Sequence, residues 1–314
     1  MNNPKTVAPV AVIKETRQTV FIRRIMDLVA PHIALRSSDK VAIKINLSGS
    51  REIYANTHYE TVAALIQYLQ DNFAVRDITV IEGSDGAYFS GKSTWDIFYK
   101  FRYREVELMG ARLADLDELP HDRMLEVDTL RGRREVALTA FPCDYLISVI
   151  PPKTHNILPV FLSVPNLVGF VKAEDRVLMF GAGGQEMKKI NFFQNEKYFD
   201  LINHTSRNFL ALSKLVIPAL TVIDGIYGME GKGPIKGSPV FHGFSVASEN
   251  VFLADAMTAH IMGFAPEEIP YLVMAESEDL CRIKLNSNIG IDPNYARFPY
   301  RPHPLYHRQK KWRR

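Results

Sequence analysis

Hydrophobic and polar positions along the chain follow two different periods. Short apolar runs rich in valine and isoleucine alternate with longer segments in which apolar residues recur every three or four positions. Runs of the first kind predict buried strands, and segments of the second kind predict helices that cover a sheet. The predicted strands are Val10–Ile13, Val41–Asn46, Ile78–Ile81, Tyr145–Ile150, Leu220–Ile223 and Phe244–Ala247. This alternation is typical of βαβ units on a mainly parallel sheet.

The helical period is clearest in the stretch HYETVAALIQYLQDNF. Its apolar residues Val62, Leu65, Ile66 and Leu69 are spaced three, one and three positions apart, which places them on one helical face. We expect that face to pack on the sheet. Comparable periods predict further helices around Phe21–Leu28, Trp95–Leu108, Tyr198–Leu212 and Val251–Met262.

The predicted fold class is α/β, with a mainly parallel, doubly wound sheet and helices on both of its faces. The stretch DTLRGRREVALTAF has Arg-Gly between two short runs, which predicts a small hairpin or antiparallel excursion. Residues 1–300 are predicted to form a single α/β domain, and residues 301–314 a basic C-terminal tail. A chain of 314 residues is long enough to bury a sizeable core.

Charge and cysteine content narrow the class of protein. The formal net charge is only +3, and the excess comes largely from Arg301, Arg308, Lys310, Lys311, Arg313 and Arg314 in the tail. The two cysteines are too few for a disulfide framework or a cysteine-based metal site. No signal-peptide apolar region is evident, and no apolar run approaches the roughly 20 residues that span a bilayer. We therefore expect a cytoplasmic protein without a membrane segment.

Polar residues follow directly on four of the predicted strands. In open α/β sheets ligands bind beyond the carboxyl ends of the strands, so these residues are the first candidates for a site. In VAIKINLSGS, Lys44 and Asn46 lie on one face of their strand, and Glu82, Ser84 and Asp85 follow the next strand. Each has a structural alternative: the lysine as a salt-bridged or snorkelling side chain, the acids as turn residues or helix caps.

The motif PPKTHN places Lys153 and His155 directly after the apolar run YLISVI. Burial at an apolar strand end lowers the pKa of a lysine, which can then act as a base or bind an anion. His155 titrates near neutrality and can share proton transfer. Pro151 and Pro152 fix the backbone before them. The alternative is an exposed loop in which both side chains are incidental.

The segment DGIYGMEGKGPIKG follows the strand that ends at Ile223. Asp224 comes first and could bind a metal, orient Lys153 or cap a turn. Gly231 and Gly233 would let backbone amides approach a ligand closely. Their spacing matches no phosphate-binding fingerprint, and a plain connecting loop is the alternative.

Several other chemistries lack their motifs. The chain has no H-E-x-x-H, no paired C-x-x-C and no G-x-S-x-G. Nucleic-acid binding is disfavoured, because it would depend on the short basic tail alone, without a recognised reading module.

The order of the motifs resembles a known family. A strand ending in Lys-Thr-His is followed by LSVPNLVG, a helix with His204, LTVIDGIYGMEGKGPIKGSPV and GFSVASENVFLADAMTAHIMGF. This order, with VAIKINLS and VIEGSDG upstream, is similar to the family called domain of unknown function 362. The resemblance covers roughly Val41 to Phe264 and is specific because the motifs occur in order. It implies a shared site at Lys153, His155, Asn166, Asp224, Glu230 and Gly231.

The chain departs from the family pattern at two points. The family usually has a Lys-Asn pair where this chain has Pro165-Asn166, so a mechanism with a second lysine at that position is not supported. Many members carry ferredoxin-like cysteine clusters, which this chain lacks, so an iron–sulfur centre is excluded. The resemblance implies no activity, because the family is defined by the lack of a known one.

The sequence thus favours an enzyme that acts on a small anionic metabolite, a carboxylate or a phosphate. Acid–base catalysis is assigned to Lys153, His155 and Asp224. Ligand binding is assigned to Lys44, Asn46, Glu82, Ser84, Asn166, Glu230, Gly231 and Gly233. The alternative is a non-catalytic ligand-binding, maturation or partner-binding protein that uses the basic tail. The sequence identifies no cofactor, metal, reaction or oligomeric state.

Overall fold

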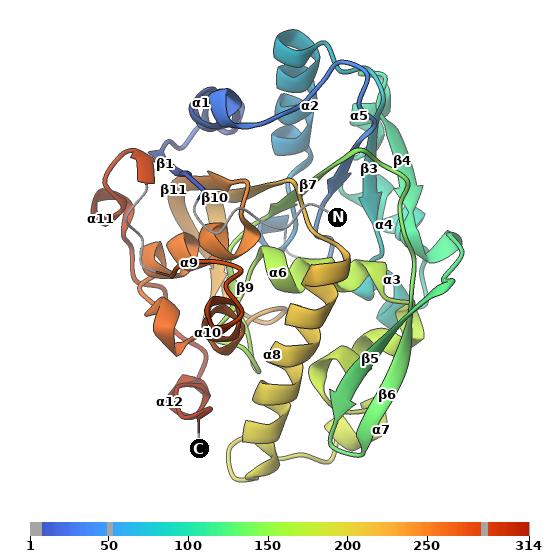
Figure 1. Ribbon diagram of the computed structural model, residues 1–314, viewed down its shortest axis with the longest axis vertical. Coiled ribbons are helices and arrows are strands. Elements are labelled where there is room, and N and C mark those ends of the chain that lie inside the picture. Colours follow the sequence, from blue (N-terminus) through green and yellow to red (C-terminus); the bar gives the residue numbers. More distant parts are fainter. Residues whose placement is uncertain (1–7, 49–52, 284–287, 314) are drawn as a thin grey trace.

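The computed structural model describes residues 8–48, 53–283 and 288–313, which form one large mixed sheet between two layers of helices (Figure 1). The strand order is β12 (Asn288–Gly290), β1 (Val10–Lys14), β11 (Ser238–Ser248), β10 (Leu220–Glu230), β7 (Tyr145–Ile150), β2 (Val41–Lys44), β3 (Ile78–Glu82) and β4 (Arg112–Asp115). Strands β10, β7, β2, β3 and β4 run parallel to one another, whereas β11 is antiparallel to β10 and β1. The α/β prediction is confirmed.

Helices cover both faces of the sheet because strand side chains alternate between two hydrophobic clusters. In β7, Leu146 and Ile150 belong to one cluster, whereas Ile147 and Val149 belong to the other. The second cluster is completed by α1 (Gln18–Val29), α2 (Tyr59–Phe73), α4 (Thr94–Lys100) and α5 (Arg104–Glu107). The first is completed by α6 (Ser163–Asn166), α8 (Lys197–Leu215), α9 (Val251–Ile261) and α10 (Pro270–Ser277).

The predicted hairpin is present and forms a two-stranded sheet of its own. Strands β5 (Arg123–Thr129) and β6 (Gly132–Leu138) pair antiparallel, beside α8 in Figure 1. The shorter helices are α3 (Asp85–Ser90), α7 (Gly184–Met187), α11 (Pro293–Ala296) and α12 (Tyr306–Gln309). None of the helices in the described part of the chain has the length and apolar composition that a membrane span requires.

Two element predictions are corrected by the structure. The helix expected over Trp95–Leu108 is divided into α4 and α5, because Arg102 adopts a left-handed conformation with φ of 66°. The strand expected to end at Ile223 continues to Glu230, because pairing with β11 satisfies its backbone beyond the end of β7. Asp224 and Glu230 are therefore strand residues and not loop residues.

The motif PPKT runs beside this extension. Strand β8 (Lys153–Thr154) pairs parallel with β10 at Met229 and antiparallel with β9 (Val160–Phe161). The Met229 amide also donates to the carbonyl of Pro152 at 3.0 Å. Strand β7 before the two prolines and strand β8 after them therefore both belong to the sheet.

The basic C-terminal segment packs against α8. Leu305 and Trp312 are 2% and 8% exposed and share a hydrophobic cluster with Tyr198 and Ile202. The Trp312 carbonyl accepts from Asn203 Nδ2 at 2.9 Å. This segment therefore contributes apolar core contacts as well as charge.

We expect Trp312→Ala to lower the free energy of unfolding by about 3 kcal/mol, because it removes a large buried side chain. The matched control is Lys311→Ala, one residue away and exposed, which should change it by less than about 0.5 kcal/mol. Chemical denaturation of both variants provides the measurement. Equal losses would show that the segment is not anchored by its tryptophan.

Candidate functional site

The carboxyl ends of β2 and β7 are covered by the chain segment that leads into α2. The Thr57 hydroxyl donates to the Val149 carbonyl at 2.9 Å and accepts from the Asn46 amide at 2.9 Å. The Tyr103 hydroxyl donates to the Thr57 carbonyl, also at 2.9 Å. The segment is thus fixed to the sheet edge at which ligands bind in open α/β proteins.

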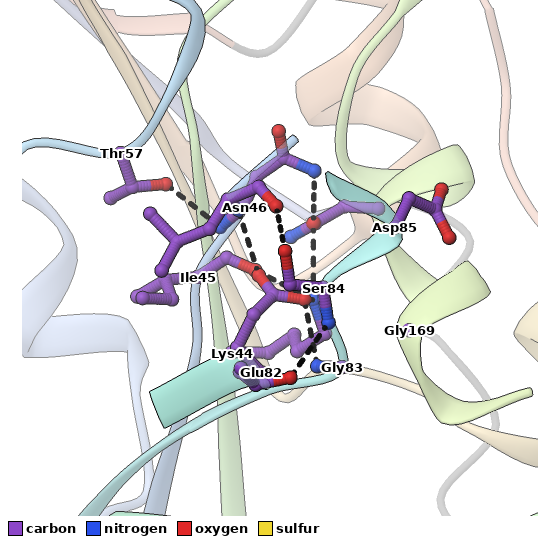
Figure 2. A network of polar contacts seen from close by, with 12 residues as sticks. Lys44, Ile45, Asn46, Thr57, Glu82, Gly83, Ser84, Asp85 and Gly169 are labelled. Atoms are coloured by element: carbon purple, nitrogen blue, oxygen red, sulfur yellow. Dashed lines mark hydrogen bonds and ion pairs between the residues drawn. The ribbon is translucent and has the colours of Figure 1, made fainter. Parts of the chain in front are cut away.

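Lys44 and Glu82 form a buried ion pair at this edge (Figure 2). Both side chains are almost completely shielded from solvent, and Lys44 Nζ lies 2.9 Å from Glu82 Oε1. The same nitrogen donates to the Ile45 carbonyl at 2.6 Å and to Asn166 Oδ1 at 3.3 Å. Lys44 therefore uses three donors, the full complement of an ammonium group.

The carboxylate of Glu82 receives two backbone hydrogen bonds as well. Its Oε1 accepts from the Gly83 amide at 2.8 Å, and its Oε2 accepts from the Leu47 amide at 3.0 Å. Burial raises the pKa of Glu82 to about 7, and the positive charge of Lys44 opposes that rise. Because three donors face this carboxyl group, we assign it the ionised form.

Two asparagine amides connect this ion pair to a second lysine. Asn166 Oδ1 accepts from both Lys44 Nζ and Asn46 Nδ2, the latter at 3.1 Å, while its Nδ2 donates to Ser148 Oγ at 3.1 Å. The side-chain oxygen of Asn46, Oδ1, accepts a hydrogen bond from Lys153 Nζ. The hydrogen-bond pattern therefore fixes the orientation of both amides.

Lys153 is fully buried and bonded only to neutral oxygens within the described residues. Its Nζ donates to Asn46 Oδ1 and to the Ala55 carbonyl at 3.0 Å, and it lies 5.2 Å from the centre of the Phe161 ring. Burial lowers the pKa of Lys153 to about 7. Among the described residues, the cluster thus holds two buried amines and one carboxylate, that of Glu82, which is bonded to Lys44.

Ser84 and Asp85 begin α3 beside this cluster. Ser84 Oγ caps the helix by accepting from the Ala87 amide at 3.1 Å, and it donates to the Leu47 carbonyl at 2.7 Å. Asp85 lies 3.5 Å from Nη1 of Arg176. Ser84 is therefore a helix cap, whereas the sequence analysis considered that role only for the acidic residues Glu82 and Asp85.

Arg176 is a buried residue of the site that no sequence motif indicated. Its guanidinium donates to the Val171 carbonyl at 2.8 Å, to the Gly169 carbonyl at 3.3 Å and to Asp117. It is 1% exposed and also pairs with Asp85. These bonds hold the backbone at Gly169 against the Lys44–Glu82 pair.

The ring of His155 is hydrogen-bonded to the backbone. Its Nδ1 accepts from the Ile157 and Leu158 amides at 3.1 and 3.3 Å, and its ring stacks on Phe180 with centroids 5.6 Å apart. Burial lowers the pKa of His155 to about 3. An Nδ1 that accepts two backbone bonds leaves the imidazole neutral, with its proton on Nε2.

Asp224 lies on β10 and contacts α2. Its carboxylate accepts from the Thr61 hydroxyl at 2.5 Å and from the Ile226 amide at 3.3 Å. Burial raises the pKa of Asp224, and the nearby His58 opposes that rise. His58 was not predicted; it is 7% exposed, stacks on Tyr227, and has a buried Nε2 with no hydrogen-bond partner in the described structure.

Glu230, Gly231 and Gly233 contact the C-terminal segment and β8. The Arg301 amide donates to Glu230 Oε2 at 2.8 Å, and the Gly231 amide donates to the Arg301 carbonyl at 2.7 Å. A Cβ on Gly233 would lie 2.0 Å from the Thr154 carbonyl oxygen. These glycines therefore allow close packing of the chain next to Lys153, and their amides are bonded within the protein.

The structure brings five predicted residues into one hydrogen-bonded cluster: Lys44, Asn46, Glu82, Lys153 and Asn166. Within the described residues, no hydrogen bond joins His155, Asp224, Glu230, Gly231 or Gly233 to it. The same part of the chain holds no group of three histidine, cysteine or acidic residues arranged for a metal ion. A concave region of about 370 Å³ lies at the opposite edge of the sheet, lined by residues such as Lys40, Asp77 and Arg112.

We expect Gly169→Ala to destabilise the protein by about 1–3 kcal/mol, because its Cβ would lie 2.8 Å from Lys44 Cε and 3.1 Å from Glu82 Oε1. The matched control is Gly184→Ala, where no atom lies within 4 Å of the added Cβ. Chemical denaturation measures both variants. Equal stability of the two variants would show that Lys44 and Glu82 can move to make room for the added methyl group.

The buried Lys153 should make stability depend on pH. Between about pH 7 and the ordinary value of 10.5, the unfolded state binds the proton that the folded state has released, so stability rises with pH. The wild type should therefore gain up to about 1.4 kcal/mol per pH unit relative to Lys153→Met. Denaturation of both proteins at several pH values across this window tests it; parallel curves would show that Lys153 stays charged.

Three comparisons relate the chain to known proteins. The thylakoid-associated protein sll1697 of Synechocystis sp. is 26% identical over 203 residues, which cover 64% of this chain and 50% of that protein, so the chain spans about half of its length. The solved lactate racemase apoprotein from Thermoanaerobacterium thermosaccharolyticum aligns with a TM-score of 0.45 and 13% identity, over 71% of this chain and 52% of its own. The family model described as domain of unknown function (DUF362) matches residues 41–260. The resemblance of the motifs is thereby confirmed, and the chain belongs to this family.

Proposed function

We propose that the protein is an enzyme that binds a small anionic metabolite, a carboxylate or a phosphate, at the carboxyl edge of the sheet, and that Lys153 transfers a proton there. The observation that supports this most directly is the charge balance of the cluster. Lys44 is neutralised by Glu82, whereas Lys153 has only neutral partners among the described residues.

A buried amine without a counterion has two ways to avoid an uncompensated charge. It can lose its proton, which is the state that burial favours for Lys153, or it can take up an anion. An anion bound beside Lys153 would raise the proton affinity of its neutral amine. The proton can come from solvent or, where the bound substrate carries an acidic proton, from the substrate itself, and this second case is general-base catalysis.

The other residues have supporting roles in this proposal. Lys44 and Glu82 form a fixed charge pair, and the amides of Asn46 and Asn166 hold the two amines at a set separation. Asp224, assigned to catalysis from the sequence, would take part in proton transfer from its position on β10 beside Thr61.

The residues around Lys153 would position it. His155 would hold the turn that follows Lys153, and not exchange protons, because its Nδ1 is occupied. Glu230, Gly231 and Gly233 would fix the neighbouring chain through their contacts with Arg301 and Thr154. Ser84 would fix the backbone of Leu47, whose amide donates to Glu82.

We propose the cytoplasm as the compartment in which this enzyme works. Cys143 and Cys281 are both free thiols, which fits a reducing environment. The proposed partner is a small molecule rather than a nucleic acid, since the apolar side chains of the basic segment are committed to packing on α8.

A thermal-shift screen with small carboxylates and phosphates tests the proposal. A ligand at about 100 times its Kd should stabilise the wild type by about 2.7 kcal/mol, and Lys153→Met should lose this stabilisation. The control is Lys172→Met, which removes an exposed lysine paired with Glu174 and should respond as the wild type does. Calorimetry of the same ligand in buffers of different ionisation enthalpy should show proton uptake. Equal stabilisation of Lys153→Met would contradict the proposal.

A further inference from the structure

The two buried lysines differ in the number of hydrogen bonds that their nitrogens donate. Lys44 Nζ donates three, to Glu82, Ile45 and Asn166, which accounts for every proton of an ammonium group. Among the described residues, Lys153 Nζ donates two, to Asn46 and Ala55. A neutral amine has two N–H bonds and one lone pair. The geometry of Lys153 therefore fits a neutral amine whose lone pair is not occupied by a protein donor in the described structure.

We propose that Lys153 is a nucleophile that forms an imine with the carbonyl group of its substrate, and that this substrate is a 2-oxo carboxylate. This inference rests on the proposed function and adds a substrate class and a covalent step to it. Lysine becomes nucleophilic when it is removed from water or placed near another cation. The first condition holds here, because Lys153 is fully buried.

The step balances without another reactant. The Lys153 nitrogen attacks the carbonyl carbon, the carbon–oxygen bond breaks, and the oxygen leaves as water after taking up two protons. These come from the amine itself and from one external proton when the product is the protonated imine. No oxidant or reductant is needed. The immediate partners of the nitrogen, Asn46 and Ala55, are neutral hydrogen-bond acceptors.

The charge balance selects the class of carbonyl compound. A protonated imine at Lys153 adds one positive charge to a cluster in which Glu82 already balances Lys44. A substrate carboxylate on the carbon next to the imine supplies the opposite charge, so the adduct is neutral overall. A simple aldehyde or ketone would leave a buried charge uncompensated, and a simple carboxylate has no carbonyl carbon for the amine to attack. A 2-oxo carboxylate meets both requirements.

Reductive trapping tests the inference. Wild-type protein is incubated with pyruvate and cyanoborohydride near pH 7, and modified lysines are located by peptide mass spectrometry. We expect one reduced pyruvate adduct, on Lys153. At this pH its neutral fraction should exceed that of the exposed Lys172 on the order of a thousandfold, since the pKa of Lys153 is about 7 and that of Lys172 lies above 10.5. Modification should increase as the pH rises through 7, and Lys153→Met should not be modified there.

The possible outcomes distinguish failure of this inference from failure of the proposed function. Absence of an adduct on Lys153, or labelling no stronger than on Lys172, overturns the imine. If anions still stabilise the protein in that case, the proposed function stands. Absence of both the adduct and anion stabilisation overturns both. If Lys153→Met does not fold, the peptide map of the wild type decides alone. The Lys172→Met variant, whose side chain is exposed, should be trapped on Lys153 as the wild type is.

Discussion

Among the described residues, one hydrogen-bonded cluster at the edge of the sheet holds two buried amines and one buried carboxylate, and this imbalance of charge constrains the residues around it. Removing charges from water costs several kcal/mol each, so the cluster is stable only if every donor is matched. The structure meets that demand with two asparagine amides, several main-chain groups and the close approach of Gly169, which leaves no room for a side chain. Among the described residues, Lys153 is the group that this matching leaves bonded to neutral oxygens alone.

Much of the fold could be predicted from the sequence, because it depends on periods that the chain carries locally. The strands at Val41 and Tyr145 and the helix that begins at Tyr59 are all marked by apolar spacing that assigns each side chain to a face. The extension of β10 to Glu230 is not marked in this way. It depends on pairing with β11, a contact between segments whose glycines favour a loop prediction.

The candidate site was predictable to the extent that it follows strand ends. Lys44, Glu82 and Lys153 each stand directly after or at the end of an apolar run, and parallel strands bring such positions to one edge. Arg176 and His58 could not be found in this way, because each lies on or beside a helix with no neighbouring motif. The role of His155 was also out of reach, since it depends on two backbone amides that turn back toward its ring.

One contact of Lys153 is made to the main chain, at the carbonyl of Ala55. A carbonyl is present whatever amino acid occupies that position, so substitutions at Ala55 that keep the backbone path would preserve the contact. Comparing relatives by their side chains would therefore overlook half of what holds this amine in place. The shape of the chain at that point, rather than its chemical identity, is the property that evolution would have to keep.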